Sequence, residues 1–358
     1  MSKFLWAFPI LFLLIPIGQA KSEKCDAPFF SGELIFEPGS VPGYPSCHAS
    51  TLVELPDGEL LAAWFAGTKE GAADTAELGA RLPPTLSPAP SPKGGGNWSV
   101  PNVLVDTPGK SDGNCVLHVD RKGRVWIFYV TKENTERRPQ WAQCRVKCRV
   151  SDDAGHTFGP ERVLREELGW MVRNKPIYLE NGTLLLPIYD ERNWSSLMFL
   201  SPDEGETWSA SERISTHEGN IQPTVAQLRD GSLLAIMRTG SAQHRLWKST
   251  SNGKGRKWMP PAEMHLPNPN SACDMVRLAN GHLVLVFNDS PRERTPLTVA
   301  LSTDEGKTWT RRRNLETGTG EFSYPAVIQT RDGLIHVTYT WKRTSIKHVA
   351  FNEAWITQ

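Results

Sequence analysis

Six polar side chains stand at a similar distance before a glycine turn in this chain, and their types could carry out acid–base or nucleophilic chemistry. They are His48, Asn114, Lys175, Gln222, Asp274 and Tyr324. A phenol or an imidazole can act as nucleophile or base, an ammonium can pair with a carboxylate, and an amide can hold hydroxyl groups. For any one of them, a strand entrance that meets solvent is an equally good explanation. Six in successive units of the chain favour one shared polar pocket.

The elements that would position these residues are β-hairpins. Each polar residue precedes a run of alternating apolar residues, a turn containing glycine, and a second β-rich run, as in "RDGSLLAIM" and "ANGHLVLVF". This pattern is typical of antiparallel hairpins. The six turn glycines are Gly58, Gly123, Gly182, Gly231, Gly281 and Gly333.

A second repeat alternates with the hairpins. The octapeptide "SPDEGETW" (201–208) returns as "STDEGKTW" (302–309), and weaker copies occupy 91–98, 151–158 and 251–258. Its aspartate can accept backbone N–H bonds, its glycine allows a left-handed conformation, and its tryptophan can fill a gap between sheets. We therefore expect the octapeptide to be scaffold and not the active site.

The two repeats together predict an all-β fold, a six-bladed β-propeller over residues 46–358. Units of roughly fifty residues with four short strands each cannot bury both faces alone, so they pack around an axis. Residues 21–45 are expected as a lead-in. Within the first blade, residues 79–97 are rich in proline and glycine, so its third strand is expected to be a loop or a damaged strand.

Longer strings carry a family resemblance. The segments "SCHASTLVELPDGELLAAWFAGTKEG", "NKPIYLENGTLLLP", "LPNPNSACDMVRLANG" and "EFSYPAVIQTRDGLIHVTYTWKRTSIKHV" resemble BNR-repeat, sialidase-like proteins of the sialidase (neuraminidase) superfamily. The octapeptide resembles the Asp-box of that superfamily. The resemblance implies a glycan substrate, a tyrosine nucleophile assisted by a glutamate, an aspartate as acid/base, and three arginines that hold a carboxylate.

Only part of that constellation is matched. Tyr324 is similar to the nucleophile, Asp74 to the acid/base, and Arg238 to one of the arginines. The departures are His48 in place of the first arginine, Gln222 in place of the glutamate, and Cys273–Asp274 near the third arginine. A neutral amide cannot take a proton from tyrosine, so Tyr324 and Gln222 form a poor pair. Glu218 is a candidate substitute for the glutamate.

Three functions follow from these residues. The first is an exo-acting glycosidase in which Asp74 protonates the leaving oxygen, Tyr324 attacks, and Arg238 pairs with a substrate carboxylate. Its other expected substrate contacts are His48, Lys175, Gln222, Asn270, Asp274 and Arg343. The second is a polysaccharide lyase in which His48 and Tyr324 remove the proton beside a uronate carboxylate. The third is a non-catalytic sugar-binding propeller that stacks sugars on Trp64, Trp170 or Trp341, although burial is the expected role of each.

The charge balance of the chain bears on its binding partners. The formal net charge is +1, so no basic surface for nucleic acid is predicted. Residues 1–20 have Lys3, an apolar run and small residues before Lys21, which predicts a cleaved signal peptide, a secreted or periplasmic protein, and no membrane span afterwards. Six cysteines leave disulfide pairing open, and Cys144 and Cys148 are a weak signal for zinc. No metal or cofactor is expected, and the oligomeric state is not predicted.

Overall fold

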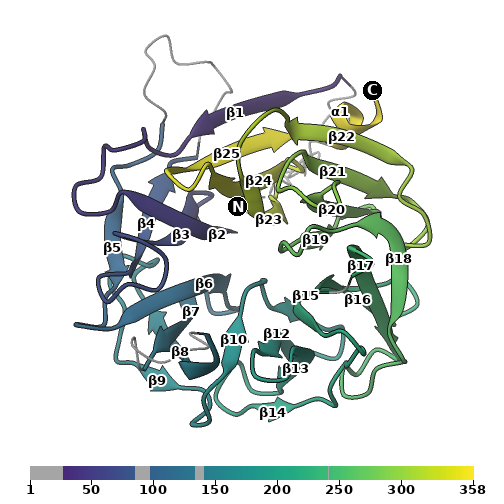
Figure 1. Cartoon of the computed structure of the whole chain (residues 1–358), viewed down its shortest axis with the longest axis horizontal. Coiled ribbons are helices and arrows are strands. Elements are labelled where there is room, and N and C mark those ends of the chain that lie inside the picture. Colours follow the sequence, from purple (N-terminus) through teal and green to yellow (C-terminus); the bar gives the residue numbers. More distant parts are fainter. Residues whose placement is uncertain (1–26, 85–96, 134–140, 241) are drawn as a thin grey trace, which may run out of the picture.

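The computed structural model describes residues 27–84, 97–133, 141–240 and 242–358. Across these residues, strands β1–β25 form six antiparallel sheets around one axis, which is the predicted six-bladed propeller (Figure 1). The expected signal peptide (1–20), Cys25 and most of the octapeptide copy at 91–98 lie outside the described residues.

Each blade runs outward from an inner strand at the axis. The first two blades are β2 (Ser46–Glu54), β3 (Leu60–Gly67), β4 (Ala76–Leu82) and β5 (Asn102–Val105), then β6 (Ser111–Val119), β7 (Val125–Lys132), β8 (Cys144–Ser151) and β9 (Arg162–Val163). The third has a divided inner strand: β10 (Trp170–Val172), β11 (Ile177–Tyr178), β12 (Leu184–Asp190), β13 (Ser195–Ser201) and β14 (Ser209–Ala210). A 3-10 turn, η1 (Trp141–Gln143), precedes β8.

The last three blades complete the ring. They are β15 (Asn220–Gln227), β16 (Leu233–Thr239), β17 (Arg245–Ser251) and β18 (Ala262–Pro267); β19 (Asp274–Arg277), β20 (Leu283–Asn288), β21 (Leu297–Ser302) and β22 (Arg311–Glu316); and β23 (Phe322–Gln329), β24 (Ile335–Trp341) and β25 (Ser345–Phe351). A short helix, α1 (Glu353–Thr357), follows.

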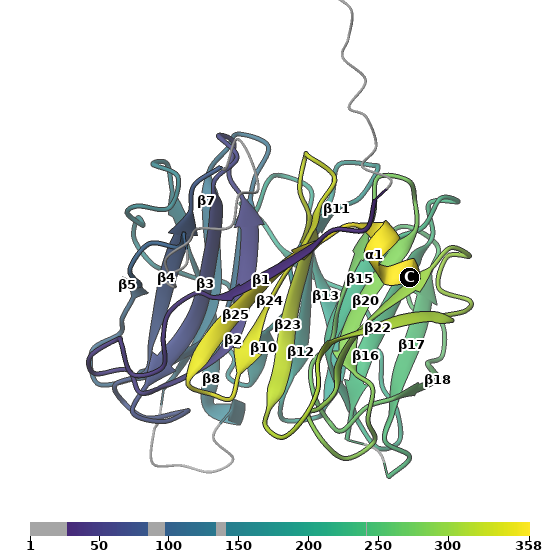
Figure 2. The same ribbon diagram turned by 90° about the horizontal axis from the view of Figure 1, so that it is seen from above.

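The sixth blade takes its outer strand from the beginning of the described chain. β1 (Phe30–Leu34) pairs antiparallel with β25, and Figure 2 shows it crossing beside that strand. The segment 21–45, expected as a lead-in, therefore contains part of the propeller. This pairing closes the ring with backbone hydrogen bonds between segments far apart in the sequence.

The first blade has a regular third strand, contrary to the expectation of a damaged one. β4 pairs with β3 along seven residues and with β5 on its other side. The proline-rich stretch starts only after Leu82, so its prolines remove no donor from the strand. Gly79 is needed within it, because a Cβ there would lie 2.5 Å from the Leu104 side chain.

The octapeptide turns are built as their residue types predict. In the copy at 201–208, Asp203 accepts hydrogen bonds from the backbone and hydroxyl of Thr207, and Ser201 accepts one from the backbone of Gly205. Gly205 has a φ of 87°, and a Cβ there would meet Trp126 of the preceding blade at 2.8 Å. Trp208 packs against Phe128 of the second blade and Phe199 of the third. The turn thus locks neighbouring blades together.

Hydrophobic clusters fill the spaces between adjacent blades. One cluster joins residues of the second, third and fourth blades, and another joins the fifth and sixth. The cysteines of the described ranges are buried and unpaired; they are Cys47, Cys115, Cys144, Cys148 and Cys273. Within those same ranges, no helix has the length and apolarity needed to cross a membrane.

Candidate functional site

One cavity of about 140 Å³ opens at the end of the axis where the inner strands begin. Every blade contributes a residue to its lining from the connection between its second and third strands, or from the end of the second strand. In blade order these residues are Glu70, Trp141, Glu191, Arg238, Arg294 and Arg343. The site is therefore assembled by all six blades.

Inner strands supply three further polar residues of the lining through a repeated distortion. Asn114, Gln222 and Tyr324 have φ values of 52°, 55° and 54°, and each lies at a β-bulge where the register of the inner strand shifts. A non-glycine residue pays a conformational cost in this left-handed region. The bulge turns these side chains out of the strand alternation and into the cavity. The expected pocket thus contains Asn114, Gln222 and Tyr324.

Tyr324 and Arg238 are in direct contact at the centre of the site. Nη1 of Arg238 donates to the Tyr324 hydroxyl oxygen at 2.5 Å and to Oε1 of Gln222 at 3.0 Å. Because arginine only donates, the Gln222 oxygen must face it, and the Gln222 amide nitrogen then lies 3.4 Å from the Tyr324 oxygen. Two donors therefore converge on the phenol oxygen.

The charges around Tyr324 favour its ionised form. Burial raises the pKa of Tyr324, but Arg238 and Arg294 lower it by more, so the pKa lies below its ordinary value of 10. The guanidinium carbons of Arg173, Arg238 and Arg294 lie 5.2, 5.8 and 5.3 Å from the ring centroid. Arginine, and not a glutamate, is thus the group that lowers the pKa of this phenol.

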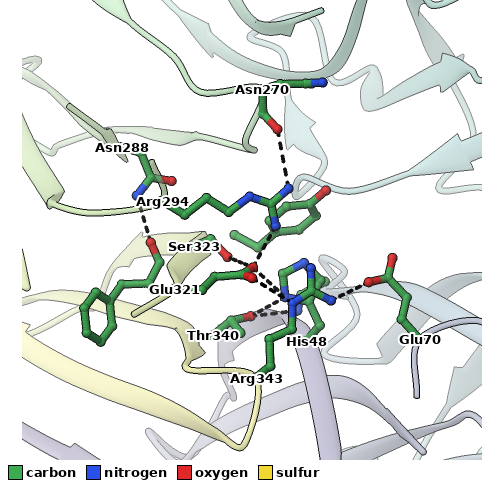
Figure 3. Close-up of polar contacts among 12 residues, drawn as sticks. His48, Glu70, Asn270, Asn288, Arg294, Glu321, Ser323, Thr340 and Arg343 are labelled. Carbon is green, nitrogen blue, oxygen red and sulfur yellow. Dashed lines mark hydrogen bonds and ion pairs between the residues drawn. The ribbon is translucent and has the colours of Figure 1, made fainter. Parts of the chain in front are cut away.

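Two further arginines share one carboxylate beside Tyr324. Figure 3 shows Glu321 between Arg294 and Arg343, to which it binds at 2.7 and 3.0 Å. Arg343 also pairs with Glu70 from the β3–β4 connection. Burial raises the pKa of Glu321, but Arg294 and Arg343 lower it by more. Arg238, Arg294 and Arg343 therefore all line the cavity. The sequence predicted only Arg238 and Arg343 as substrate-binding residues.

Asn270 holds the arginines and does not face the cavity itself. Its Oδ1 atom accepts a bond of 2.5 Å from Nε of Arg238, and its backbone oxygen accepts one of 3.5 Å from Arg294. The structure thus places Asn270 behind two of the lining arginines.

Glu191 is a lining carboxylate that the sequence analysis missed. It follows β12 directly, and its backbone N–H is fixed by the carbonyl of Gly169 at 2.8 Å. Within the described residues its carboxylate has neither a hydrogen bond nor an ion pair. Burial, followed by the nearby charge of Asp190, raises the pKa of Glu191 to about 7, although Arg238 acts in the opposite direction.

His48 lies beneath Tyr324 and not among the lining residues. Its ring centroid is 4.0 Å from that of Tyr324, and its Nδ1 atom is 2.8 Å from the hydroxyl of Thr340. The side chain is 2% exposed. Burial, with Arg343 and the other arginines, holds the pKa of His48 well below 6.5, so the imidazole is neutral.

Asp74 is in the expected loop, but its carboxylate does not line the cavity. The side chain is exposed and accepts bonds from the backbone and hydroxyl of Thr68. The same loop brings Glu70 to the cavity and is anchored by a bond of 3.1 Å from Nζ of Lys132 to the backbone oxygen of Gly71.

Lys175 and Asp274 belong to the framework across the axis, contrary to their expected role in binding substrate. Asp274 is 1% exposed, and its carboxylate accepts bonds from Lys175, Thr224 and the backbone of Val327. It thereby ties the third, fourth, fifth and sixth blades together. Lys175 borders a separate cavity of about 430 Å³ near the hairpin ends of the inner strands, on the other side of this layer.

Arg173 completes the same layer. It is 1% exposed and donates to the backbone oxygens of Ser50 in the first blade and of Tyr324 and Pro325 in the sixth. The break between β10 and β11 makes this possible, because the chain there turns its side chains into the axis. Arg173 thus supports the backbone of Tyr324 from below.

Several functional candidates could have been found by aligning the connections between second and third strands. That comparison places Glu191, Arg294 and Glu70 at corresponding places in their blades. The repeat pattern is dominated by the hairpin turns, and it therefore predicts mainly residues of the inner strands. The stacking candidates Trp64 and Trp170 are buried, as expected, and the tryptophan that lines the cavity is Trp141. Glu218 is exposed outside the lining.

The site chemistry is that of acidic and basic side chains. No group of three or more histidine, cysteine, aspartate or glutamate residues with metal-binding geometry occurs in the part of the chain that the structure describes. In particular, Cys144 and Cys148 belong to no such group, and burial raises the pKa of Cys148 to about 12.

Residues 58–337 match the family model described as the BNR repeat-like domain. The chain belongs to this family. It is 24% identical to a sialidase of Micromonospora viridifaciens over 355 aligned residues, covering 88% of this chain and 52% of that protein. The BNR chain therefore spans about half the length of this curated relative.

Solved structures with the same fold include sialidases. The Hadza microbial sialidase Hz136 has a TM-score of 0.72 at 17% identity, covering 89% of this chain and 68% of that one. The intramolecular trans-sialidase of Ruminococcus gnavus, in complex with oseltamivir carboxylate, has a TM-score of 0.71 at 14% identity, covering 91% and 98%. A protein of unknown function from Dyadobacter fermentans has a TM-score of 0.73 at 14% identity, covering 90% and 97%. The chain is thus a sialidase-like BNR propeller.

Proposed function

We propose that this protein is an exo-acting glycoside hydrolase of the sialidase type that releases terminal acidic sugars from glycans. The observation that carries the proposal is the convergence of Arg238, Arg294 and Arg343 on the cavity that contains the Tyr324 hydroxyl. Planar guanidinium groups suit a carboxylate because each can donate two parallel bonds. The sialidase relatives described above support the same substrate class.

Tyr324 would act as the nucleophile. Its oxygen is held by two donors and its pKa is lowered, so attack on the anomeric carbon does not require the glutamate that Gln222 replaces. Arg294 and Arg343 would bind the substrate carboxylate from the side of Glu321. A strained, positively surrounded tyrosine in a cavity also favours catalysis over simple sugar binding.

The lyase alternative is less well supported. It assigned proton abstraction to His48 and Tyr324 together, and of this pair Tyr324 lines the cavity while the His48 imidazole is buried beneath it. Export from the cell remains a prediction of residues 1–20, consistent with a glycan substrate outside the cytoplasm.

A fluorogenic α-sialoside tests the proposal. We expect the wild-type protein to release the fluorophore, and Tyr324→Phe to lower kcat by about a thousandfold or more, because the nucleophilic oxygen is removed. Tyr44→Phe is the matched control, since Tyr44 lies outside the cavity. Absence of turnover by the wild-type protein, or an unchanged rate in Tyr324→Phe, would refute the proposal.

A further inference from the structure

We propose that Glu191 is the proton-transferring group of this site, a role that rests on the proposed glycosidase function. It would protonate the leaving oxygen and then take a proton from the attacking water. The sequence had assigned this role to Asp74, whose carboxylate is exposed and bound to Thr68.

The first argument is availability. Three carboxylates line the cavity or border its arginines, and two of them form ion pairs with arginine. Glu321 pairs with Arg294 and Arg343, and Glu70 pairs with Arg343. Glu191 lines the same cavity and, in the described ranges, its carboxylate binds no other side chain. It is the carboxylate that can change protonation without breaking an ion pair.

The second argument is placement. Glu191 leaves the axis-facing end of β12 directly after Tyr189 and Asp190, and its backbone is pinned to Gly169. Tyr189 reaches the Gln222 amide at 3.4 Å, the same group that contacts Tyr324. Asp190 beside it is held by Arg192 and Arg213, so it stays ionised. The carboxylate is therefore delivered to the cavity from a rigid strand end.

The third argument is chemical suitability. A general acid works best when its pKa is near the working pH. Burial and the negative charge of Asp190 raise the pKa of Glu191 to about 7, so both protonation states are available near neutrality. The titratable groups that interact with it are Arg238, Asp190, Tyr189 and Cys144, of which Arg238 opposes the increase.

The steps balance without any further reactant. Tyr324 starts as the phenolate, and its oxygen forms a bond to the anomeric carbon while the bond to the leaving oxygen breaks and that oxygen takes the proton of Glu191. Water then attacks the same carbon and gives its proton to the Glu191 carboxylate, while the bond to Tyr324 breaks and the phenolate is restored. The net reaction is hydrolysis, and Glu191 ends protonated as it began.

Leaving-group dependence tests the role. Glu191→Gln should hydrolyse a 4-methylumbelliferyl α-sialoside, whose phenol leaves readily, at a rate within about tenfold of wild type, and sialyllactose about a hundredfold or more slowly. The alkaline limb of the wild-type kcat profile near pH 7 should disappear. Glu263→Gln, an exposed glutamate on the outer strand β18, is the matched control. Equal losses on both substrates would overturn the proposal.

A second measurement separates this inference from the proposed function. If the pKa of Glu191 is raised, the urea midpoint of wild type should fall relative to Glu191→Gln as the pH rises from 4.5 to 7. A difference between the two proteins that is independent of pH would show an ordinary carboxylate and overturn the inference. A wild-type protein that cleaves neither substrate refutes the proposed function, whichever result the urea titration gives.

Discussion

Arg238 donates a hydrogen bond of 2.5 Å to the hydroxyl oxygen of Tyr324, and the same Nη1 atom fixes the orientation of Gln222. This contact gives Gln222 a different role from the one expected from the sequence. On sequence grounds an amide beside the tyrosine is a weak partner, because it cannot accept the phenol proton. In the structure it is a second donor to the phenol oxygen, and both donors stabilise the phenolate.

Asp274 is predicted to be a stability residue and not a substrate ligand. Asp274→Asn removes the charge that pairs with Lys175 at 2.7 Å, and it weakens the accepted bonds from Thr224 and Val327. We expect the free energy of unfolding to fall by about 3 kcal/mol in urea denaturation. The KM of the folded protein for the fluorogenic α-sialoside should be unchanged. Asp57→Asn, on an exposed hairpin turn, is the control. A large rise in KM with normal stability would contradict this assignment.

Buried histidines predict loss of stability in acid. Burial lowers the pKa of His336 to about 4, and burial with His336 keeps the pKa of His348 well below 6.5; their rings are stacked 5.2 Å apart. Because the folded pKa values lie below the unfolded ones, the unfolded chain binds protons first, and stability falls as the pH drops from 6.5 towards 4. A shift of the His336 pKa from 6.5 to about 4 corresponds to about 3 kcal/mol, which is the expected size of its contribution.

Urea midpoints at pH 7.5 and 4.5 measure the effect. The decrease between the two pH values should be smaller in His336→Gln than in wild type, whatever the substitution costs at pH 7.5. His217→Gln, an exposed histidine, should lose as much as wild type. An equal decrease in wild type and His336→Gln would exclude His336 as a source of the acid sensitivity.

The repeats were sufficient to predict the propeller because short segments of the sequence determine the local conformation of each turn and strand. The glycine turns, the alternating strands and the octapeptide of Asp203 and Trp208 each specify their own geometry. The pairing of β1 with β25 was not predictable in this way, since it joins segments more than three hundred residues apart and has no repeat signature.

The site was only partly predictable for a related reason. Tyr324 and Gln222 were found because they stand on inner strands at a fixed distance before a hairpin. Arg294 and Glu191 lie in connections of different lengths, so their convergence depends on the ring of blades. Asp274 stands at a similar distance before its hairpin turn as the lining residues do before theirs. Its side chain nevertheless binds Thr224 and the backbone of Val327 in neighbouring blades and does not reach the cavity.

Gln222→Glu distinguishes activation by arginine from activation by a glutamate. The new carboxylate would lie about as far from Arg238 and Tyr324 as the present amide, at 3.0 and 3.4 Å. Its negative charge should pair with Arg238 and raise the pKa of Tyr324, so the phenolate fraction and kcat near pH 7 should fall by about tenfold. The phenol can be titrated by its ultraviolet absorbance, with Tyr324→Phe as the blank. Gln329→Glu, at the half-buried end of β23 beside its hairpin turn, controls for the added charge. Faster turnover in Gln222→Glu would mean that the phenol of Tyr324 is better activated by a carboxylate than by Arg238.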